Sequence, residues 1–345
     1  MSIRIGIICP SEIAFRRFLP ALKTVDDFSF ACIGVASAEE WYGPDVQYDT
    51  EEEKIRIEKE TAKAQTFLDA WGGGKIIVGY ENLVSSDEID AVYLPLPPAL
   101  HFKWAKLALQ QDKHVFVEKP STTDATDTNE LIELARANNL ALHENYMFVY
   151  HEQLKVLDDV VAGGEIGEVR LYRITFGFPR RAQNDFRYNK SLGGGALIDA
   201  GGYTIKYASY LLGETARLTT AHLNYLDDFE VDMYGTATMV NDKGVTAQLA
   251  FGMDNDYKCE IEIWGSKGTI TSNRILTAPA GFVPEYTIKK NQEYETRKLP
   301  ADDAFKKSIV RFLDCIKDSS CRKEEYELVG REAVLLTDFE KMCKL

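Results

Sequence analysis

The stretch Ile3-Arg4-Ile5-Gly6-Ile7-Ile8-Cys9, followed by Pro10, decides the fold of the first half of the chain. An apolar run of this length that ends at a turn residue is typical of a strand buried on both faces of a parallel sheet. No basic region precedes the run and no small-residue cleavage site follows it, so it does not have the form of a secretory signal. We therefore predict a first strand here and a helix over residues 11–23.

The same alternation of strand and helix continues to residue 144. Runs of the buried-strand type occur at residues 3–9, 28–36, 75–78, 90–94, 114–117 and 140–144. Helical patterns separate them at residues 11–23, 51–71, 99–111 and 124–137. Strands that alternate with helices form βαβ units, so this half predicts the α/β class with a doubly wound parallel sheet of the Rossmann type.

Beyond residue 144 the pattern changes to long alternating strands joined by short hairpin turns. Strands are expected at residues 169–178, 218–226, 232–240, 245–251, 258–264 and 268–272, and helices at 151–161, 302–317 and 328–344. This half predicts an α+β domain with a large, mostly antiparallel sheet. We expect residues 1–122 to bind a dinucleotide and residues 123–345 to bind substrate and mediate oligomerisation, with the C-terminal helices able to pack back on the first domain.

Composition excludes several classes of function. The chain has 345 residues and a formal charge of −14, which opposes binding to nucleic acid or to an anionic membrane surface. No apolar run reaches the ~18 residues of a membrane span. Six cysteines without CxxC spacing indicate reduced thiols in a cytoplasmic protein. Five histidines without paired spacing predict no metal site.

Three glycines, Gly193-Gly194-Gly195, precede a helical pattern that carries Asp199 and Tyr203. Residues four apart lie on one face of a helix, so this carboxylate and this phenol can meet a common target. A phenol with its ordinary pKa near ~10 is a poor acid at neutral pH, and a nearby cation would lower that pKa. Taken alone, Asp199 could equally be an acid favoured by the helix dipole, and Tyr203 a half-buried packing residue.

Two turns follow strands at the carboxyl edge, where open α/β sheets bind ligands. Glu118-Lys119-Pro120 brings an ammonium group to this edge, and such a group can orient a substrate carbonyl and depress the pKa of a tyrosine. In isolation, a solvated lysine before a turn proline is the simpler interpretation. The turn Leu94-Pro95-Leu96-Pro97, with His101 after it, either walls a cofactor site or is only a proline-rich helix start.

The first strand–helix turn, Cys9-Pro10-Ser11-Glu12-Ile13-Ala14, is a weak dinucleotide fingerprint. Cysteine and serine stand where phosphate-binding glycines are expected, and only the third, small position is kept, at Ala14. Ser11 can still offer its hydroxyl and amide to a phosphate, with Arg16 in the helix behind it. The second strand runs on to Ser37 without an acid that would hold a ribose 2′-hydroxyl, which favours NADP(H) over NAD(H).

In this order the motifs resemble the glucose–fructose oxidoreductase/inositol dehydrogenase (Gfo/Idh/MocA) family over nearly the whole chain. The resemblance rests on residues 118–120, 163–169 and 193–199 and on the antiparallel second half. Within the family, the chain is most similar to NDP-hexose 3-ketoreductases of deoxysugar pathways, through residues 14–21, 94–101, 144–148 and 184–188. The glycine-poor cofactor loop departs from the family pattern but is tolerated in that branch. An insertion at roughly residues 41–60 has no match.

The resemblance implies Lys119 and Tyr203 as the catalytic pair, with Asp199 beside them in role. With the turns described above, it implies a cofactor-binding set of Ser11, Glu12, Ile13, Ala14, Arg16, Ser37, Leu94, Pro95, Leu96, Pro97, His101, Glu118, Lys119, Asn145 and Arg187. It implies a substrate-binding set of Lys119, Tyr146, Phe148, Arg181, Phe186, Asp199 and Tyr203. The arginines among residues 180–187 would also suit a diphosphate in this acidic chain, or form a basic surface loop.

We therefore expect an NAD(P)H-dependent oxidoreductase that reduces the 3-keto group of a nucleotide-linked (deoxy)hexose, with Tyr203 as the acid and Lys119 as its partner. The same residues would serve a dehydrogenase of a free sugar, polyol or trans-dihydrodiol. The glycine-poor loop leaves a third alternative, a catalytically inactive sensor or scaffold. An open face on the antiparallel sheet predicts a homo-oligomer, dimer or tetramer, formed sheet to sheet.

Overall fold

The computed structural model describes residues 2–43 and 45–344, which form two compact units. Unit 1 runs to Thr122 and also contains Thr126–Asn145 and Ser308–Val329. Unit 2 contains Thr123–Ala125, Tyr146–Lys307 and the chain from Gly330 onward. The sequence placed one boundary at residue 122 and allowed the C-terminal helices to pack back on the first domain. In the structure, residues 126–145 and residues 308–329 of those helices belong to the first unit.

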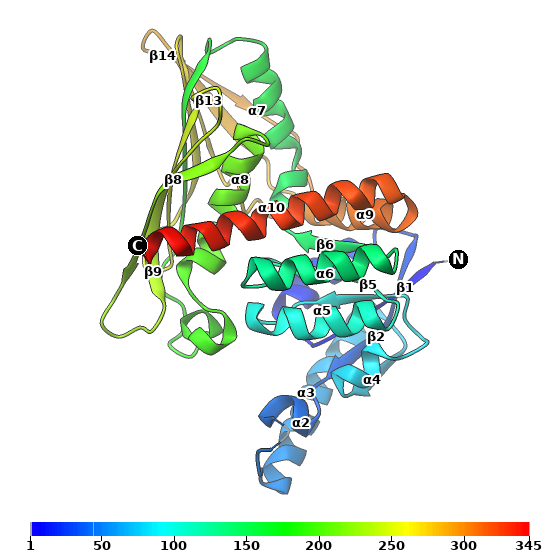
Figure 1. Cartoon of the computed structure of the whole chain (residues 1–345). Coiled ribbons are helices and arrows are strands. Elements are labelled where there is room, and N and C mark those ends of the chain that lie inside the picture. Colours follow the sequence, from blue (N-terminus) through cyan, green and yellow to red (C-terminus); the bar gives the residue numbers. More distant parts are fainter. Residues whose placement is uncertain (1, 44, 345) are drawn as a thin grey trace. The chain divides into compact units, whose positions relative to one another are not determined.

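Unit 1 contains the predicted doubly wound sheet (Figure 1). Its strands lie in the order β3-β2-β1-β4-β5-β6, and every neighbouring pair is parallel. They are β1 (Ile3–Ile7), β2 (Phe28–Val35), β3 (Lys75–Val78), β4 (Ala91–Leu94), β5 (His114–Glu118) and β6 (Leu142–Asn145). All residues of β4 and β6 are buried, as is typical of a parallel sheet covered on both faces. The α/β class of the first half is confirmed.

Among the described residues, ten helical segments lie wholly or partly in unit 1, and several of them cover apolar side chains of this sheet. They are η1 (Ala14–Phe18), α1 (Leu19–Leu22), α2 (Ala38–Tyr42), α3 (Thr50–Trp71), α4 (Tyr80–Val84), η2 (Pro98–Leu100), α5 (His101–Gln110), α6 (Ala125–Ala137), α9 (Ala304–Lys317) and α10 (Ser319–Cys343). Phe18 stacks on Tyr93 of β4 with ring centroids 3.9 Å apart. Phe312 of α9 packs edge-on against Phe116 of β5 at 5.3 Å, which ties this late segment of the chain to the parallel sheet.

Helix α3 forms where the charged stretch predicted it. Asp49 is its N-cap and accepts the N–H of Glu51 at 2.8 Å, so an acidic side chain satisfies a main-chain donor of the first turn. Near its other end, the ring of Phe67 lies 5.0 Å from that of Phe15 in η1. The described part of the unmatched insertion (residues 41–43 and 45–60) therefore consists of the end of α2, a loop and the first turns of α3.

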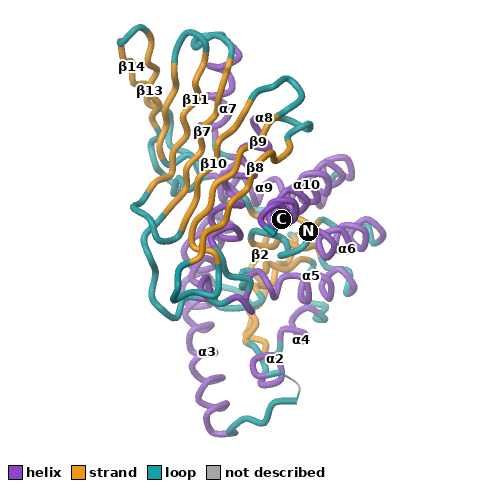
Figure 2. The backbone as a smooth tube through the Cα atoms, turned by 60° about the vertical axis from the view of Figure 1, so that its left-hand side comes forward, coloured by secondary structure: helices purple, strands orange, loops and turns teal. Residues whose placement is uncertain are grey.

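Unit 2 contains an eight-stranded sheet in the order β14-β13-β12-β11-β7-β10-β9-β8, and Figure 2 shows these strands side by side. They are β7 (Val169–Gly177), β8 (Arg217–Tyr225), β9 (Asp232–Val240), β10 (Thr246–Gly252), β11 (Lys258–Gly265), β12 (Thr269–Asn273), β13 (Glu285–Lys290) and β14 (Glu293–Lys298). Only the β7–β10 pair is parallel. The prediction of a mostly antiparallel sheet is confirmed.

The sequence analysis missed the hairpin of β13 and β14. In β13 only Tyr286 and Ile288 are buried apolar residues. The edge strand β14 is exposed along most of its length and shows no alternation of apolar residues. Its turn uses Asn291 and Gln292, both with positive φ (49° and 70°), rather than a pair with glycine. Helix α10 begins at Ser319 instead of residue 328, because its first turns are polar as well.

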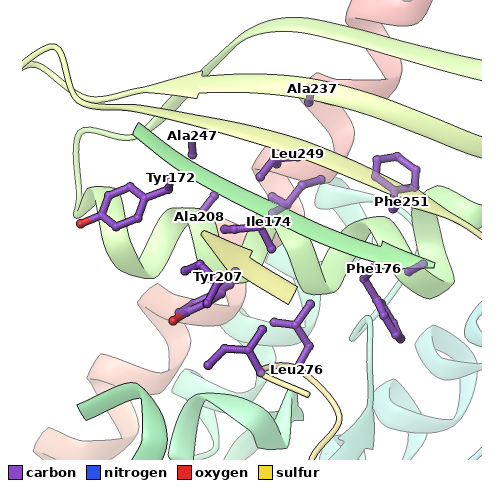
Figure 3. Packing of buried hydrophobic residues seen from close by; sticks show 14 of the residues in the cluster. Tyr172, Ile174, Phe176, Tyr207, Ala208, Ala237, Ala247, Leu249, Phe251 and Leu276 are labelled. Atoms are coloured by element: carbon purple, nitrogen blue, oxygen red, sulfur yellow. The ribbon is translucent and has the colours of Figure 1, made fainter. Parts of the chain in front are cut away.

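One face of the unit 2 sheet forms the core of that unit (Figure 3). Tyr172, Ile174 and Phe176 alternate along β7 and point to this face, together with Leu249 and Phe251 of β10. Helix α8 (Gly202–Leu212) packs against β7 and β10. Two further helical segments of this unit are η3 (Met147–Tyr150) and α7 (Glu152–Ala162).

The other face of the sheet carries polar and aromatic side chains. Arg173 of β7 donates to Glu262 of β11 at 2.9 Å and to Gln248 of β10 at 3.1 Å. Trp264, whose ring lies 5.9 Å from the Arg173 guanidinium, is half exposed. This face is therefore open to solvent in the single chain.

Within residues 2–43 and 45–344, no helix combines the length and apolar character needed to cross a bilayer. The same residues contain no group of three His, Cys, Asp or Glu side chains that could hold a metal ion. All six cysteines are free thiols.

The buried ring of His114 predicts a pH dependence of stability. Burial lowers the pKa of His114 to about 4, and its Nδ1 accepts the N–H of Ala141 at 2.9 Å. An unfolded histidine titrates near ~6.5, so between these values the unfolded chain binds the extra proton and the folded state loses stability as pH falls. We expect His114→Asn, which keeps an acceptor, to reduce this loss by up to ~1.4 kcal/mol per pH unit, measured by urea unfolding from pH 6.5 to 4.

The exposed His222 supplies the control for this measurement. His222→Asn should leave the slope of unfolding free energy against pH unchanged. If His114→Asn showed the same slope of unfolding free energy against pH as the parent protein, His114 would not be the source of the pH dependence.

Candidate active site

The carboxyl edge of unit 1 has its topological switch point where β1 lies next to β4. The chain order reverses here, since β1 has β2 on one side and β4 on the other, and doubly wound folds bind dinucleotides at such a switch point. The loop after β1 and the turn after β4 lie together, because Cys9 Sγ is 3.6 Å from the carbonyl oxygen of Pro95. The predicted phosphate loop and the proline turn are thus neighbours.

Ser11 begins the helix after β1. Its hydroxyl accepts the N–H of Ala14 at 3.2 Å, and Ala14 itself is fully buried. Glu12 and Ile13 form the exposed first turn, and Arg16 pairs with Glu12 at 3.1 Å on the surface. An anion at this turn would meet the positive end of a helix dipole and the Ser11 side chain.

The end of β2 is built around a capping box. Ser37 accepts the N–H of Glu40 through its hydroxyl, and the Glu40 carboxylate accepts the N–H of Ser37 at 2.8 Å. The same carboxylate accepts the N–H groups of Tyr80 (2.8 Å) and Glu81 (2.9 Å) at the start of α4. Glu40 is therefore compensated by three main-chain donors.

His101 joins the two carboxyl-edge turns that the sequence singled out. Nε2 lies 2.8 Å from the carbonyl oxygen of Leu96, and Nδ1 lies 2.8 Å from that of Pro120. Leu94, Pro95 and Leu96 are buried and Pro97 is partly exposed. Burial lowers the pKa of His101 to about 4, although the two carbonyl oxygens act in the opposite direction. The ring links the turns on either side of it.

A buried chain of hydrogen bonds holds the strand end that carries Lys119. The Glu118 carboxylate accepts Tyr93 OH at 2.7 Å and Asn145 Nδ2 at 2.8 Å. Ser308 of α9 donates to Asn145 Oδ1 at 2.8 Å, which fixes the amide so that its nitrogen faces Glu118. Although burial raises the pKa of Glu118, these donors and Lys119 act in the opposite direction.

The chain continues into the C-terminal helices. His143 Nε2 lies 2.8 Å from Ser308 Oγ, and His143 Nδ1 lies 2.8 Å from Glu325 of α10. Arg311 of α9 donates to Glu325 at 3.2 Å. Sequence reasoning missed Ser308, Glu325 and Arg311 as members of this chain, because a single polar residue on an apolar strand or helix face carries no spacing signal.

In unit 2, the glycine stretch forms the predicted loop before a helix. Gly194 and Gly195 donate their N–H groups to the carbonyl oxygens of Asn189 and Arg187, each at 3.0 Å. The helix then opens with a π-turn, η6 (Leu197–Gly201), which continues directly into α8. Single π-turns of this kind occur often at functional sites.

Asp232, at the start of β9, anchors the beginning of this helix. Its Oδ2 accepts the N–H of Leu197 at 2.6 Å, and the carboxylate is buried. Burial raises the pKa of Asp232 to about 6, against the effect of the main-chain donors. Asp232 was missed because nothing in the sequence pairs a strand residue with a helix 35 positions earlier.

Asp199 is held by an arginine. Arg187 Nε donates to Asp199 at 2.7 Å, and Arg187 Nη1 donates to Asp185 at 3.1 Å. Burial opposes the charge of Arg187, but the two carboxylates raise its pKa overall. Arg187, expected to bind cofactor, thus orients Asp199 within unit 2.

Tyr203 lies in an aromatic environment. Its ring centroid is 5.3 Å from that of Tyr146, 5.7 Å from that of Phe148 and 5.3 Å from that of Phe176. Tyr146 and Phe148, expected to bind substrate, are buried and hold the Tyr203 ring. These contacts fix the orientation of the Tyr203 ring, and the Tyr203 side chain is only partly buried.

Arg181 and Phe186, also expected to bind substrate, lie at the exposed end of the same region. The Arg181 guanidinium lies 5.3 Å from the ring of Phe178, and its main-chain N–H donates to Tyr188 OH at 2.7 Å. Phe186 lies under the Arg187 guanidinium at 4.6 Å. Among the described residues, no carboxylate pairs with Arg181, so its charge is available to an anion.

Two family profiles match the chain. One, described as "Oxidoreductase family, NAD-binding Rossmann fold", matches residues 28–146. The other, "GFO/IDH/MocA C-terminal domain", matches residues 154–271. Together they cover more than half of the chain.

Individual relatives are similar over almost the whole length. The dTDP-3,4-didehydro-2,6-dideoxy-alpha-D-glucose 3-reductase of Actinomadura kijaniata is 36% identical over 334 residues, 97% of this chain and 93% of its own. The enzyme of the same description from Streptomyces violaceoruber is 37% identical over 317 residues, 92% and 86% of the two chains. A crystal structure of KijD10, a 3-ketoreductase from A. kijaniata in complex with NADP and TDP-benzene, superposes with a TM-score of 0.89 at 35% identity, covering 99% and 98% of the two chains.

Gly195 provides a test of the Asp232 anchor. Its φ is +124°, and a Cβ added there would lie 2.3 Å from Asp232 Oδ1. We expect Gly195→Ala to lower the free energy of unfolding by roughly 2–4 kcal/mol, from backbone strain and displacement of the carboxylate. Gly244, with φ +77° and nothing within 4 Å of its Cβ position, is the control, because Gly244→Ala adds strain alone. If urea unfolding gave the same loss of unfolding free energy for Gly195→Ala and Gly244→Ala, Asp232 would not anchor the start of this helix.

Proposed function

The chain belongs to the GFO/IDH/MocA oxidoreductase family, and we propose that it reduces the 3-keto group of a dTDP-linked deoxyhexose with NADPH. Similarity over nearly the full length to 3-reductases of such sugars carries this proposal. The family relationship that the motifs predicted is confirmed. The assignment of individual residues below is our proposal.

The loop after β1 suits a dinucleotide even without its usual glycines. None of the described residues 8–14 has a positive φ, so cysteine and serine adopt this turn without the strain that would call for glycine. Ser11 and the first helical turn would receive the pyrophosphate. When bound along this edge, the reduced nicotinamide supplies the hydride that the substrate's carbonyl carbon accepts.

Tyr203 is the proposed proton donor. As the carbonyl carbon becomes tetrahedral, its oxygen gains negative charge and takes the phenolic proton of Tyr203. Lys119 is the proposed cationic partner, which attracts the same oxygen and favours the phenolate that remains. Asp199, held by Arg187, would orient a hydroxyl of the sugar.

The nucleotide part of the substrate would use the exposed end of unit 2. The rings of Tyr203, Phe176 and Phe178 follow one another at 5.3 and 5.7 Å, and the Arg181 guanidinium lies over the last of them. A nucleotide sugar carries its diphosphate a few bonds from the carbonyl, which matches an arginine placed beyond the phenol along the same aromatic series.

We also propose that the open face of the unit 2 sheet forms a homo-oligomer in the cytoplasm. Trp264 and Tyr234 are exposed on this face, next to the Arg173–Glu262 pair, and aromatic and arginine side chains are enriched in interfaces. Six free thiols suit a reducing compartment.

Sedimentation velocity should show a dimer or tetramer for the parent protein and a smaller species for Trp264→Glu. A monomeric parent protein would exclude this interface.

Removal of the Tyr203 hydroxyl tests the mechanism. With a dTDP-linked 3-ketosugar, Tyr203→Phe should lower kcat by about 100-fold or more, because the oxygen loses its proton donor. The dissociation constant of NADPH, measured by fluorescence titration, should stay within about twofold. Tyr210→Phe is the matched control: it lies on the same helix, binds Asp158 at 2.5 Å and should leave kcat unchanged.

Retained turnover in Tyr203→Phe would exclude this residue as the acid. Turnover of free sugars, polyols or trans-dihydrodiols in preference to the dTDP-linked substrate would replace the proposed substrate class. Failure of the parent protein to bind either NADPH or NADH would indicate a scaffold.

A further inference from the structure

The segment at roughly residues 41–60, which the sequence motifs left unmatched, places an arginine at the end of β2. Arg56, in the early part of α3, donates from Nη2 to the carbonyl oxygen of Ala36 at 2.8 Å. Ala36 directly follows β2, and in doubly wound dinucleotide folds the end of this strand is where the adenosine ribose lies. A residue twenty positions along the chain is thereby placed beside Ser37.

The guanidinium is held in one orientation. Glu53 accepts Arg56 Nε at 2.7 Å and Nη2 at 2.6 Å, and the ring of Trp41 lies 4.8 Å from Arg56 Cζ. The side chains of both members of the ion pair are about one-tenth exposed or less. The Glu53 carboxylate and the Ala36 carbonyl together accept the N–H groups of Nε and Nη2. Neither of them accepts an N–H group of Nη1.

Nη1 of Arg56 is buried and has no hydrogen-bond partner among the described residues. Buried N–H groups of a charged side chain are costly when no acceptor is present. The Arg56 guanidinium is permanently charged. Its Nε and Nη2 groups have acceptors and its Nη1 group has none within the described part of the chain, so the guanidinium is suited to bind a second anion. Two acids near it are already compensated, since Glu53 is paired with Arg56 and Glu40 accepts three main-chain N–H groups.

We propose that Arg56 binds the 2′-phosphate of the adenosine ribose and selects NADP(H) over NAD(H), an inference that rests on the proposed nicotinamide cofactor. Ser37 stands at the position where an acid would hold a 2′-hydroxyl, and no arginine stands directly beside Ser37 in the sequence. The Nη1 edge would supply two donors to phosphate oxygens, while Glu53 fixes the plane of the guanidinium. The insertion thus provides a cation that the end of β2 lacks.

Binding, rather than turnover, separates this role from a structural one. In fluorescence titrations with the full-length protein, the parent should bind NADPH at least tenfold more tightly than NADH. Arg56→Gln should weaken NADPH by about 10- to 100-fold, the effect of one lost charge-assisted contact, and change NADH by less than about twofold. Competition by adenosine 2′,5′-bisphosphate should weaken by the same factor, and competition by 5′-AMP should not.

Two further variants guard against a folding artefact. Glu53→Gln with Arg56→Gln removes both charges, so no unpaired carboxylate stays buried, and should show the same selective loss. Arg297→Gln breaks a comparable bidentate pair with Glu165 in unit 2 (2.8 and 3.0 Å) and should alter neither affinity.

Equal weakening of NADPH and NADH in the Arg56 variants would show that the pair only joins α3 to β2, and would overturn the inference. A parent protein that binds NADH as tightly as NADPH would overturn it too. Binding of neither nucleotide would overturn the inference together with the proposed cofactor. Selective loss of NADPH in a protein that fails to reduce dTDP-linked ketosugars would support Arg56 and reject only the proposed substrate.

Discussion

The hydrogen bonds to the buried Glu118 carboxylate hold the carboxyl edge of the unit 1 sheet beside Lys119. This carboxylate accepts donors from Tyr93 on β4 and Asn145 on β6, so three adjacent strands are joined by side chains where they end. A carboxylate in such surroundings is tolerated only while its partners stay in place. The partner Asn145 is in turn fixed by Ser308 of α9. The late helices therefore help to define the geometry of the strand end beside Lys119.

Asp232 has the corresponding part in unit 2. A buried acid from β9 accepts the N–H of Leu197, at the start of the helix that carries Asp199 and Tyr203. In both units the side chain that we propose to be catalytic stands next to a backbone segment that a buried carboxylate holds. Rigid support of this kind is what positions catalytic groups to within fractions of an ångström. The arrangement explains why both acids lie deep in the fold although neither is proposed to touch the reacting atoms.

Short-range patterns carried most of the fold that could be predicted. The buried strands of unit 1 follow from spacing alone, and so does the helix after the three glycines, but the π-turn that contains Asp199 does not. Arg56, Asp232 and Ser308 could not be predicted, because each acts on a residue that is distant in sequence and carries no periodic signal. The β13–β14 hairpin was lost for another reason: an exposed edge strand need not alternate, and its turn contains no glycine.

The π-turn at η6 has a consequence for how this region tolerates change. A turn closed by the N–H of Gly202 on the carbonyl of Leu197 contains one more residue than an α-helical turn. Each residue added to or removed from a helix rotates everything that follows by about 100°. The number of residues between the glycine loop and Tyr203 therefore determines the direction in which the Tyr203 side chain leaves the helix. Single-residue insertions and deletions between Gly195 and Tyr203 would turn the phenol away even if every side chain were kept, whereas conservative substitutions there leave its phase intact.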